Sequence, residues 1–226
     1  MVERHFDEEL TTLKTDLIKM DSLVEEAIFK SVEAIKNRDK QMAQEVIDGD
    51  SRIDEMENII EENAIGLLAL RQPMAVDLRF ITTGMKINAE LERMADLAVN
   101  IAQRALEIAD KPLLKPMIDI PRLSELAIKM VKGAIDAFVN KDEKLAKEII
   151  LTDPQANALK NAVQEELVND YMVKDGSTAT RAVPLLLATR HLERICDHAT
   201  NIAEDVIYMV QARVVKHRKL ENGKER

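Results

Sequence analysis

Two matching stretches of this sequence carry carboxylates at a spacing suited to binding a cation. Residues 90–103 read ELERMADLAVNIAQ and residues 191–204 read HLERICDHATNIAE, with eight of fourteen positions identical. On a helix, residues four apart share a face, so the Glu and the Asp of each stretch lie side by side. Like charges so placed repel by about a few tenths of a kcal/mol unless something positive lies between them. A metal ion would relieve that repulsion.

A helical wheel extends each pair into a polar row along one edge of the buried stripe. With ~100° per residue, the first row is Asn88, Glu92, Asp96 and Asn100, and the second is Thr189, Glu193, Asp197 and Asn201. Oxygen ligands suit hard or borderline ions such as Mg, Mn, Ca and Fe. The candidate metal ligands are therefore Glu92, Asp96, Asn100, Glu193, Asp197 and Asn201. Further ligands would come from neighbouring helices, water or phosphate.

A simpler interpretation is a solvated helix edge held by salt bridges, because each Glu is followed directly by Arg93 or Arg194. Spacings of this kind are common on helix surfaces. The repetition argues against it. Glu, Arg, Asp and Asn are retained in both stretches, while the residues between them differ.

The elements that must position these rows are helices. Aromatic residues are only 3% of the chain and charged residues 32%, which favours helices packed through Leu, Ile, Val, Ala and Met. Apolar residues recur every three or four positions from residue 10 to residue 35, which predicts a first helix ending near Asn37. A short helix over 39–48 is expected to stop at Gly49, with Asp50 capping the next helix.

Pro73 predicts a turn into a third long helix over about 74–109, and the proline-rich stretch 110–122 predicts a linker. The pattern then restarts. A shift of 103 residues places 37–50 over 140–153 with six of fourteen positions identical. Pro154 is expected to break the second copy where Gly49 breaks the first.

The predicted fold is all-α: two tandem, sequence-repeated three-helix bundles, residues 1–110 and 111–226. Helices of ~30 residues would be about 45 Å long, so we expect an elongated body.

Composition excludes several classes of protein. The net charge of −9 argues against nucleic acid as a partner. The longest apolar runs, 64–70 and 182–188, are too short to cross a bilayer, and the acidic amino terminus does not resemble a signal peptide. We therefore expect a cytoplasmic protein that meets a membrane only through a partner. No phosphate-binding loop, nucleophile elbow or dinucleotide fingerprint occurs.

The histidines and the single cysteine predict no site of their own. His5, His191, His198 and His217 lack the tight spacing of a zinc site, and the single Cys196 takes the place of Ala95 on the buried side. A small packed residue is the expected role of Cys196.

With the duplicated unit, the stretch QPMAVDLRF at 72–80 and the twin LERMADLAVNIA and LERICDHATNIA segments, the sequence resembles the PhoU family of bacterial phosphate-uptake regulators. The resemblance covers roughly residues 6–211. The second copy departs from it by reading STATRAVPL where the first has QPMAVDLRF. The resemblance implies two three-helix bundles in a cytoplasmic protein without enzymatic activity.

The resemblance also implies partners and a cofactor. PhoU-like proteins link the ATPase subunit of a phosphate ABC transporter to a phosphate-sensing histidine kinase, and they damp both when phosphate is plentiful. Members of the family look like proteins that bind multinuclear metal clusters. The resemblance therefore implies Fe or another divalent or trivalent ion (Mg, Mn or Zn) at the two E-x-x-x-D pairs, Glu92 with Asp96 and Glu193 with Asp197. Long exposed helices make a homodimer an expectation as well.

Two other functions stay open at this point. One is a metal-dependent enzyme, either a hydrolase or a di-iron type oxidase, because carboxylate rows also serve catalysis. The other is a purely structural helical module that binds no metal.

Overall fold

The computed structural model describes residues 2–213, with side chains from residue 5 onward. Every regular element in that range is helical, so the all-α prediction is confirmed. The expectation for His217 lies outside the described residues. The long helices are α1 (Val2–Asn37), α2 (Lys40–Arg71), α3 (Ala75–Ile108), α4 (Asp119–Asn140), α5 (Glu143–Glu166) and α6 (Ala179–Gln211). Between α5 and α6 lie a π-helical segment, η1 (Leu167–Met172), and a 3₁₀ turn, η2 (Gly176–Thr178).

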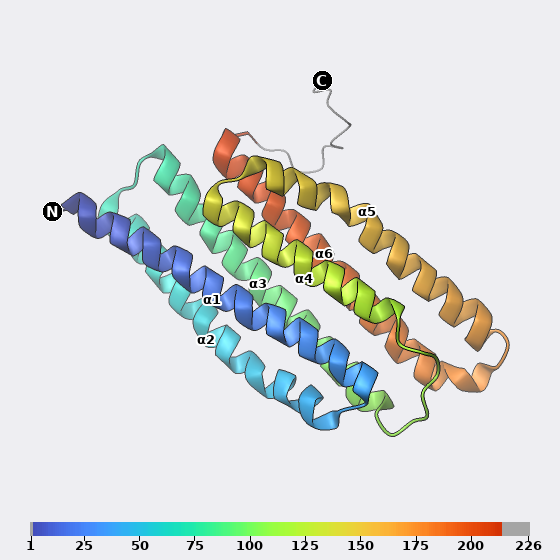
Figure 1. The fold of residues 1–226 in the computed structure, drawn as a ribbon. Helices are drawn as coiled ribbons and strands as arrows, with labels where there is room; N and C mark the ends of the chain where they lie inside the picture. Colours follow the sequence, from blue (N-terminus) through green and yellow to red (C-terminus); the bar gives the residue numbers. More distant parts are fainter. Residues whose placement is uncertain (1, 214–226) are drawn as a thin grey trace.

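The helices form two three-helix bundles packed side by side in an elongated molecule (Figure 1). Helices α1, α2 and α3 make the first bundle, and α4, α5 and α6 make the second. Contacts of α3 with α6 and of α1 with α4 join the two. Within residues 2–213, α2 contacts only α1 and α3, so α2 and α5 are the outer helices of the assembly.

Short connections punctuate the helices much as the sequence predicts. Asp39 caps α2 by accepting a hydrogen bond from the Met42 amide, and Asp142 caps α5 in the same way. Gln72 adopts a left-handed backbone just before Pro73, and α3 begins two residues later. The linker is shorter than expected because α4 already begins at Asp119, inside the predicted stretch 110–122.

The predicted breaks at Gly49 and Pro154 are wrong. Gly49 and Asp50 lie inside the uninterrupted α2, and Pro154 lies inside α5. Buried residues on both sides of each position hold these helices together: Val46 and Ile53 around Gly49, Ile149 and Ala156 around Pro154. Burying such side chains contributes about 1.5–3 kcal/mol each for the larger ones, which exceeds the ~1 kcal/mol that a glycine costs in a helix.

Polar contacts between α3 and α6 show that these helices are antiparallel. Arg79 donates to the Met209 carbonyl near one end, and Lys86 lies 3.1 Å from the Asp205 carboxylate further along. Glu90 meets His198 near the middle. Because α3 and α6 are equivalent helices of the two repeats, the repeats face each other in opposite directions.

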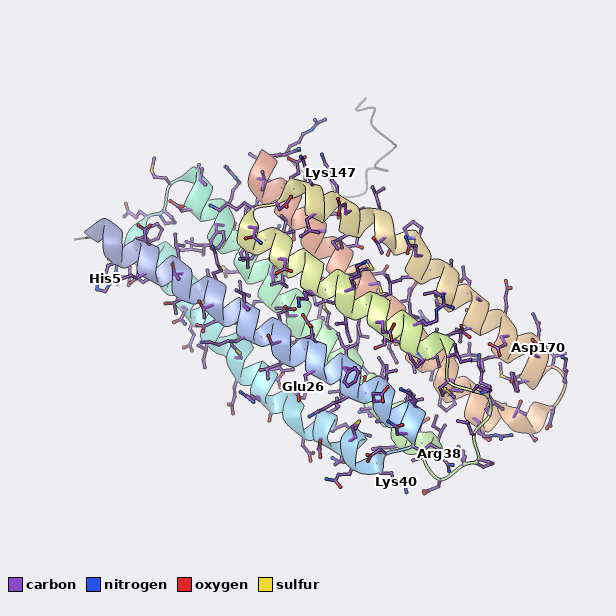
Figure 2. All side chains as sticks on the ribbon, viewed as in Figure 1. His5, Glu26, Arg38, Lys40, Lys147 and Asp170 are labelled. Atoms are coloured by element: carbon purple, nitrogen blue, oxygen red, sulfur yellow. The ribbon has the colours of Figure 1, made fainter. Side chains whose placement is uncertain are left out.

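The outer faces of the helices are highly charged, with side chains such as Glu26 and Asp170 pointing away from the molecule (Figure 2). The apolar residues of both halves meet in one continuous core. Among the described helices, none combines the length and the apolar character that crossing a bilayer would need.

Candidate functional site

The paired carboxylates of the first stretch, Glu92 and Asp96, lie on the side of α3 that faces α2. Glu92 is half-buried and Asp96 is exposed, and both interact electrostatically with acidic residues of α2. Together they form a group that we call the first acidic row: Asp50, Asp54 and Glu57 of α2 with Glu92 and Asp96 of α3.

Crowding of negative charge is the main electrostatic property of the first acidic row. Burial, reinforced by Asp54 and Asp96, raises the pKa of Asp50 to about 6. Burial and the neighbouring carboxylates also raise the pKa of Glu57 and that of Glu92 above their ordinary values, with Arg93 opposing the shift. Such a site favours a proton or a metal ion over bare carboxylates.

The equivalent carboxylates of the second stretch lie between α6 and α5. The second acidic row consists of Glu193 and Asp197 of α6 with Asp153 of α5. Burial and then Glu193 and Asp153 raise the pKa of Asp197 to about 6. Unlike the first row, this one contains a cation, because Lys160 Nζ lies 3.1 Å from Glu193 Oε1.

The two asparagines predicted as ligands have other partners. Asn100 donates its amide hydrogen to the Asp96 carbonyl of its own helix at 2.8 Å. Asn201 donates to Glu90 Oε2 of the other bundle at 3.2 Å, beside the 2.6 Å contact of His198 with the same oxygen. Asn201 therefore joins the bundles together, and its place among metal ligands stays a prediction.

Arginine does not neutralise the first row in the way the simpler interpretation requires. Arg93 Nη1 bonds to Glu90 Oε1 at 3.1 Å, on the side of α3 away from Glu92. Cys196 is buried as expected, and burial raises the pKa of its thiol, so it stays protonated.

Sequence reasoning missed the acidic residues of α2 and the lysine of α5. Two signals pointed to them. Asp50 and Asp153 are identical positions of the repeat at a shift of 103, and Asp54 follows Asp50 at the helical spacing of four. The predicted helix break at Gly49 hid both signals, because it placed Asp50 at a cap instead of on a continuous helix face.

The oxygen donors are of the type that binds a hard cation, but in this structure their side chains are too far apart to coordinate one ion. In the part of the chain that the structure describes, no three Asp, Glu, His or Cys side chains converge closely enough to hold one ion. Asp54 and Asp96 are exposed, so their carboxylates can rotate at little cost. Holding a metal would require such a rotation.

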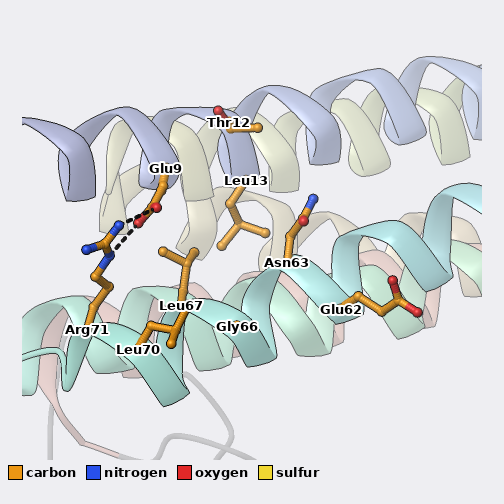
Figure 3. A pocket seen from close by; sticks show the side chains of 9 residues that line it. All are labelled: Glu9, Thr12, Leu13, Glu62, Asn63, Gly66, Leu67, Leu70 and Arg71. Carbon is orange, nitrogen blue, oxygen red and sulfur yellow. Dashed lines mark hydrogen bonds and ion pairs between the residues drawn. The ribbon is translucent and has the colours of Figure 1, made fainter.

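Grooves lie between the described helices, and two of them are lined by an ion pair. One of about 480 Å³ borders the second row and includes Lys160, Arg190 and Glu193 in its lining. The other, of about 260 Å³, lies between α1 and α2 at the far end of the first bundle, where Arg71 forms a two-pronged ion pair with Glu9 (Figure 3). That second groove has an apolar floor and lies away from both rows.

The amino-acid sequence is similar to those of known proteins along almost its whole length. The PhoU domain profile matches residues 17–105 and again residues 120–206. A phosphate-specific transport system accessory protein PhoU homolog from Aquifex aeolicus is 41% identical, over 96% of this chain and 98% of that protein. A homolog of the same description from Pseudomonas aeruginosa is 35% identical over 99% of this chain and 93% of its own length.

Two solved structures have the same architecture. The crystal structure of PhoU from Pseudomonas aeruginosa superposes with a TM-score of 0.87 at 35% identity, covering 92% of this chain and 100% of that one. The phosphate transport system regulatory protein PhoU from Streptococcus pneumoniae superposes with a TM-score of 0.86 at 29% identity, covering 93% and 99%. The similarity therefore extends over both bundles.

Proposed function

The chain belongs to the PhoU family of phosphate transport accessory and regulatory proteins, and from this we propose that it regulates phosphate uptake as an adaptor. Its partners would be the ATPase subunit of a phosphate ABC transporter and a phosphate-sensing histidine kinase. It would hold down transport and the phosphate-starvation genes when phosphate is plentiful. The observation that carries the proposal is the family match in both halves, which leaves no room for a separate catalytic domain in residues 17–206.

PhoU proteins are accessory regulators and not enzymes, so the hydrolase and oxidase alternatives are set aside. The chain would act in the cytoplasm, as a homodimer, and would reach the membrane through the transporter. A structural module without a regulatory role remains the competing function.

Deletion of the gene tests the regulatory proposal. In phosphate-rich medium, the deletion strain should transcribe its phosphate-starvation genes at the level that wild type shows only in phosphate-poor medium. Complementation with the intact gene should restore repression. Unchanged transcription in the deletion strain would favour the purely structural module.

We further propose that the acidic rows bind metal, with Fe, Mn, Mg or Zn as candidate ions. Support comes from the row of oxygen donors on α2 and α3 and from the pKa of Glu92, which burial and then the neighbouring carboxylates raise above its ordinary value. A bound cation would neutralise the carboxylates and fasten α2 to α3. Asp50 and Glu57 are the further ligands that α2 would supply.

Metal analysis of purified protein tests this second part. Replacing Glu92, Asp96, Glu193 and Asp197 together by Ala should abolish bound metal measured by mass spectrometry after incubation with each ion. The variant should keep its helical circular dichroism. Retention of the full metal content would remove these residues from the ligand set.

A further inference from the structure

Helices α2 and α5 occupy equivalent places in the two halves and bury apolar residues at equivalent positions. They differ in the charged residues at the positions next to these. At a shift of 103 residues, the buried Ile53 and Ile60 of α2 correspond to the buried Ala156 and Val163 of α5. The polar positions next to and between them then correspond in the same register: Asp50 with Asp153, Asp54 with Asn157, Glu57 with Lys160, and Glu61 with Gln164. Only the first of these four pairs is acidic in both halves.

In the second half, α5 supplies partners for Glu193 and for one oxygen of Asp153, whose other oxygen, Oδ1, is buried without a hydrogen-bond partner in the described structure. Lys160 forms the ion pair with Glu193, and the Asn157 amide donates to Asp153 Oδ2 at 3.0 Å. The groove beside this row is also lined by Arg190. A metal ion would have to displace the lysine from Glu193 and approach past an arginine.

At the equivalent positions of the first half, α2 holds four acidic residues, Asp50, Asp54, Glu57 and Glu61. Within residues 5–213, none of the five carboxylates of the first acidic row forms an ion pair with Lys, Arg or His. Arg93, whose charge opposes the rise in the pKa of Glu57 and of Glu92, forms its ion pair with Glu90 instead. Among the described residues, no ion pair therefore relieves the repulsion in this row.

A buried oxygen at the first row points independently to a ligand. Asn88, one turn before Glu92, is 2% exposed, and its amide nitrogen donates to the Glu57 carbonyl at 2.9 Å. Its carbonyl oxygen is buried without any hydrogen-bond partner. The equivalent residue of the second half, Thr189, has its hydroxyl satisfied by the Leu185 carbonyl. An amide oxygen is a usual ligand of hard cations, and burying it without a partner costs about 1–3 kcal/mol.

We infer that the chain binds its divalent cation at the first acidic row, and that in the second row the Lys160 ammonium occupies the place of that cation. The inference rests on the proposed metal-binding function. It adds that the first acidic row binds the metal ion and the second does not. The first bundle would then respond to metal, whereas in the second bundle Lys160 of the same chain supplies the positive charge.

Titration with Mn²⁺ alone, followed by the electron paramagnetic resonance signal of the free ion, tests the inference. Two matched variants are compared, Glu92→Gln/Asp96→Asn in the first row and Glu193→Gln/Asp197→Asn in the second. The first should weaken Mn²⁺ binding at least about tenfold, as the loss of groups supporting a metal site does. The second should change it less than about twofold, within the scatter of surface substitutions.

Exchanging the residues of the two helices gives a reciprocal test. Asp54→Asn/Glu57→Lys should abolish the Mn²⁺ site of the first half, and Asn157→Asp/Lys160→Glu should create a second class of sites. Both pairs introduce residues that the other half already holds at the same helical positions, so the fold should tolerate them. Circular dichroism and thermal unfolding check this, and Glu92→Gln alone replaces any pair that fails to fold.

The possible failures are distinguishable. Equal weakening by the two matched variants would overturn the inequality and leave metal binding standing. No Mn²⁺ bound by the wild type would overturn this inference, whereas the metal part of the proposed function would fall only if the wild type bound none of the candidate ions. Neither result would touch the regulatory part, which depends on transcription in the deletion strain.

Discussion

At the scale of single residues, the most unusual group outside the rows is Asp21 at the contact of α1 with α4. It is only 5% exposed, and its Oδ1 has no hydrogen-bond partner in the described structure. Glu25 lies beside it on α1, and Asp136 and Lys132 face it from α4. Burial, with the charge of Glu25, raises the pKa of Asp21 to about 8, and burial also raises that of Glu25. The pair therefore keeps a proton at neutral pH.

This proton makes stability depend on pH. The folded protein holds it up to about pH 8, whereas an unfolded Asp loses it near pH 4, so the free energy of unfolding falls as pH rises between these values. Asp21→Asn imitates the neutral acid and should raise the free energy of unfolding at pH 8 by roughly 1–3 kcal/mol.

Urea unfolding at pH 5, 6.5 and 8 measures the effect of Asp21→Asn, and the advantage of the variant should grow with pH. The matched control is Asp7→Asn, an exposed position of the same helix. A variant that is less stable than wild type at pH 8 would show that Asp21 is ionised in the fold.

At the scale of helices, the burial of apolar side chains outweighs the tendency of glycine and proline to end a helix. Gly49 and Pro154 both suggest a helix end, yet each lies inside a helix whose buried face continues on both sides. The same continuity aligns Asp50 and Asp54 with the carboxylates of α3. Uninterrupted outer helices are thus a condition of the first acidic row.

Alanine substitution of two helical glycines tests this account. A Cβ at Gly49 would meet nothing within 4 Å, whereas a Cβ at Gly133 would lie 2.6 Å from the Ile149 Cδ1. Gly49→Ala should therefore raise the free energy of unfolding by about 0.5–1 kcal/mol. Gly133→Ala should gain less or lose stability, because the methyl group of Ile149 must move.

Thermal unfolding of both glycine variants gives the comparison directly. Gly49→Ala should unfold at a higher temperature than wild type and than Gly133→Ala. A loss of stability in Gly49→Ala would mean that the helix needs a flexible point there in spite of its continuous burial.

At the scale of the whole molecule, the two bundles share an apolar core and a polar interface. Glu90 of α3 is the central residue of that interface, because it accepts hydrogen bonds from Asn201 and bonds both His198 and Arg93. Burial tends to raise the pKa of Glu90, but these partners prevail and lower it. An ionised carboxylate thus fastens the antiparallel helices α3 and α6.

Sharing a core predicts that both halves unfold together. Circular dichroism in urea and hydrogen exchange in helices of either half should report one coincident transition. Glu90→Ala should lower the free energy of unfolding by about 1–3 kcal/mol without splitting the transition, because the half-buried His198 and Asn201 lose their acceptor. Glu165→Ala, exposed on α5, is the control and should change it by less than about 0.5 kcal/mol.

Two resolved transitions would instead show that the bundles fold independently. The division of the chain at residues 110 and 111 stays a prediction until this measurement is made.

The helical class, the tandem repeat and the spacing of Glu92 with Asp96 and of Glu193 with Asp197 can all be predicted from the amino-acid sequence. These features depend on periodicity along one helix, and 3.6 residues per turn brings residues four apart together whatever the surroundings. Family resemblance was visible for the same reason, since both copies of the repeat keep this local pattern.

The side chains that face each acidic row depend on how the helices pack and could not be predicted from the sequence. The packing of α2 against α3 brings Asp54 near Glu92, and the packing of α5 against α6 brings Lys160 to Glu193. Packing also turned Asn201 toward the opposite bundle. Charges interact through space, and a spacing read along one helix contains no information on the helix that will lie against it.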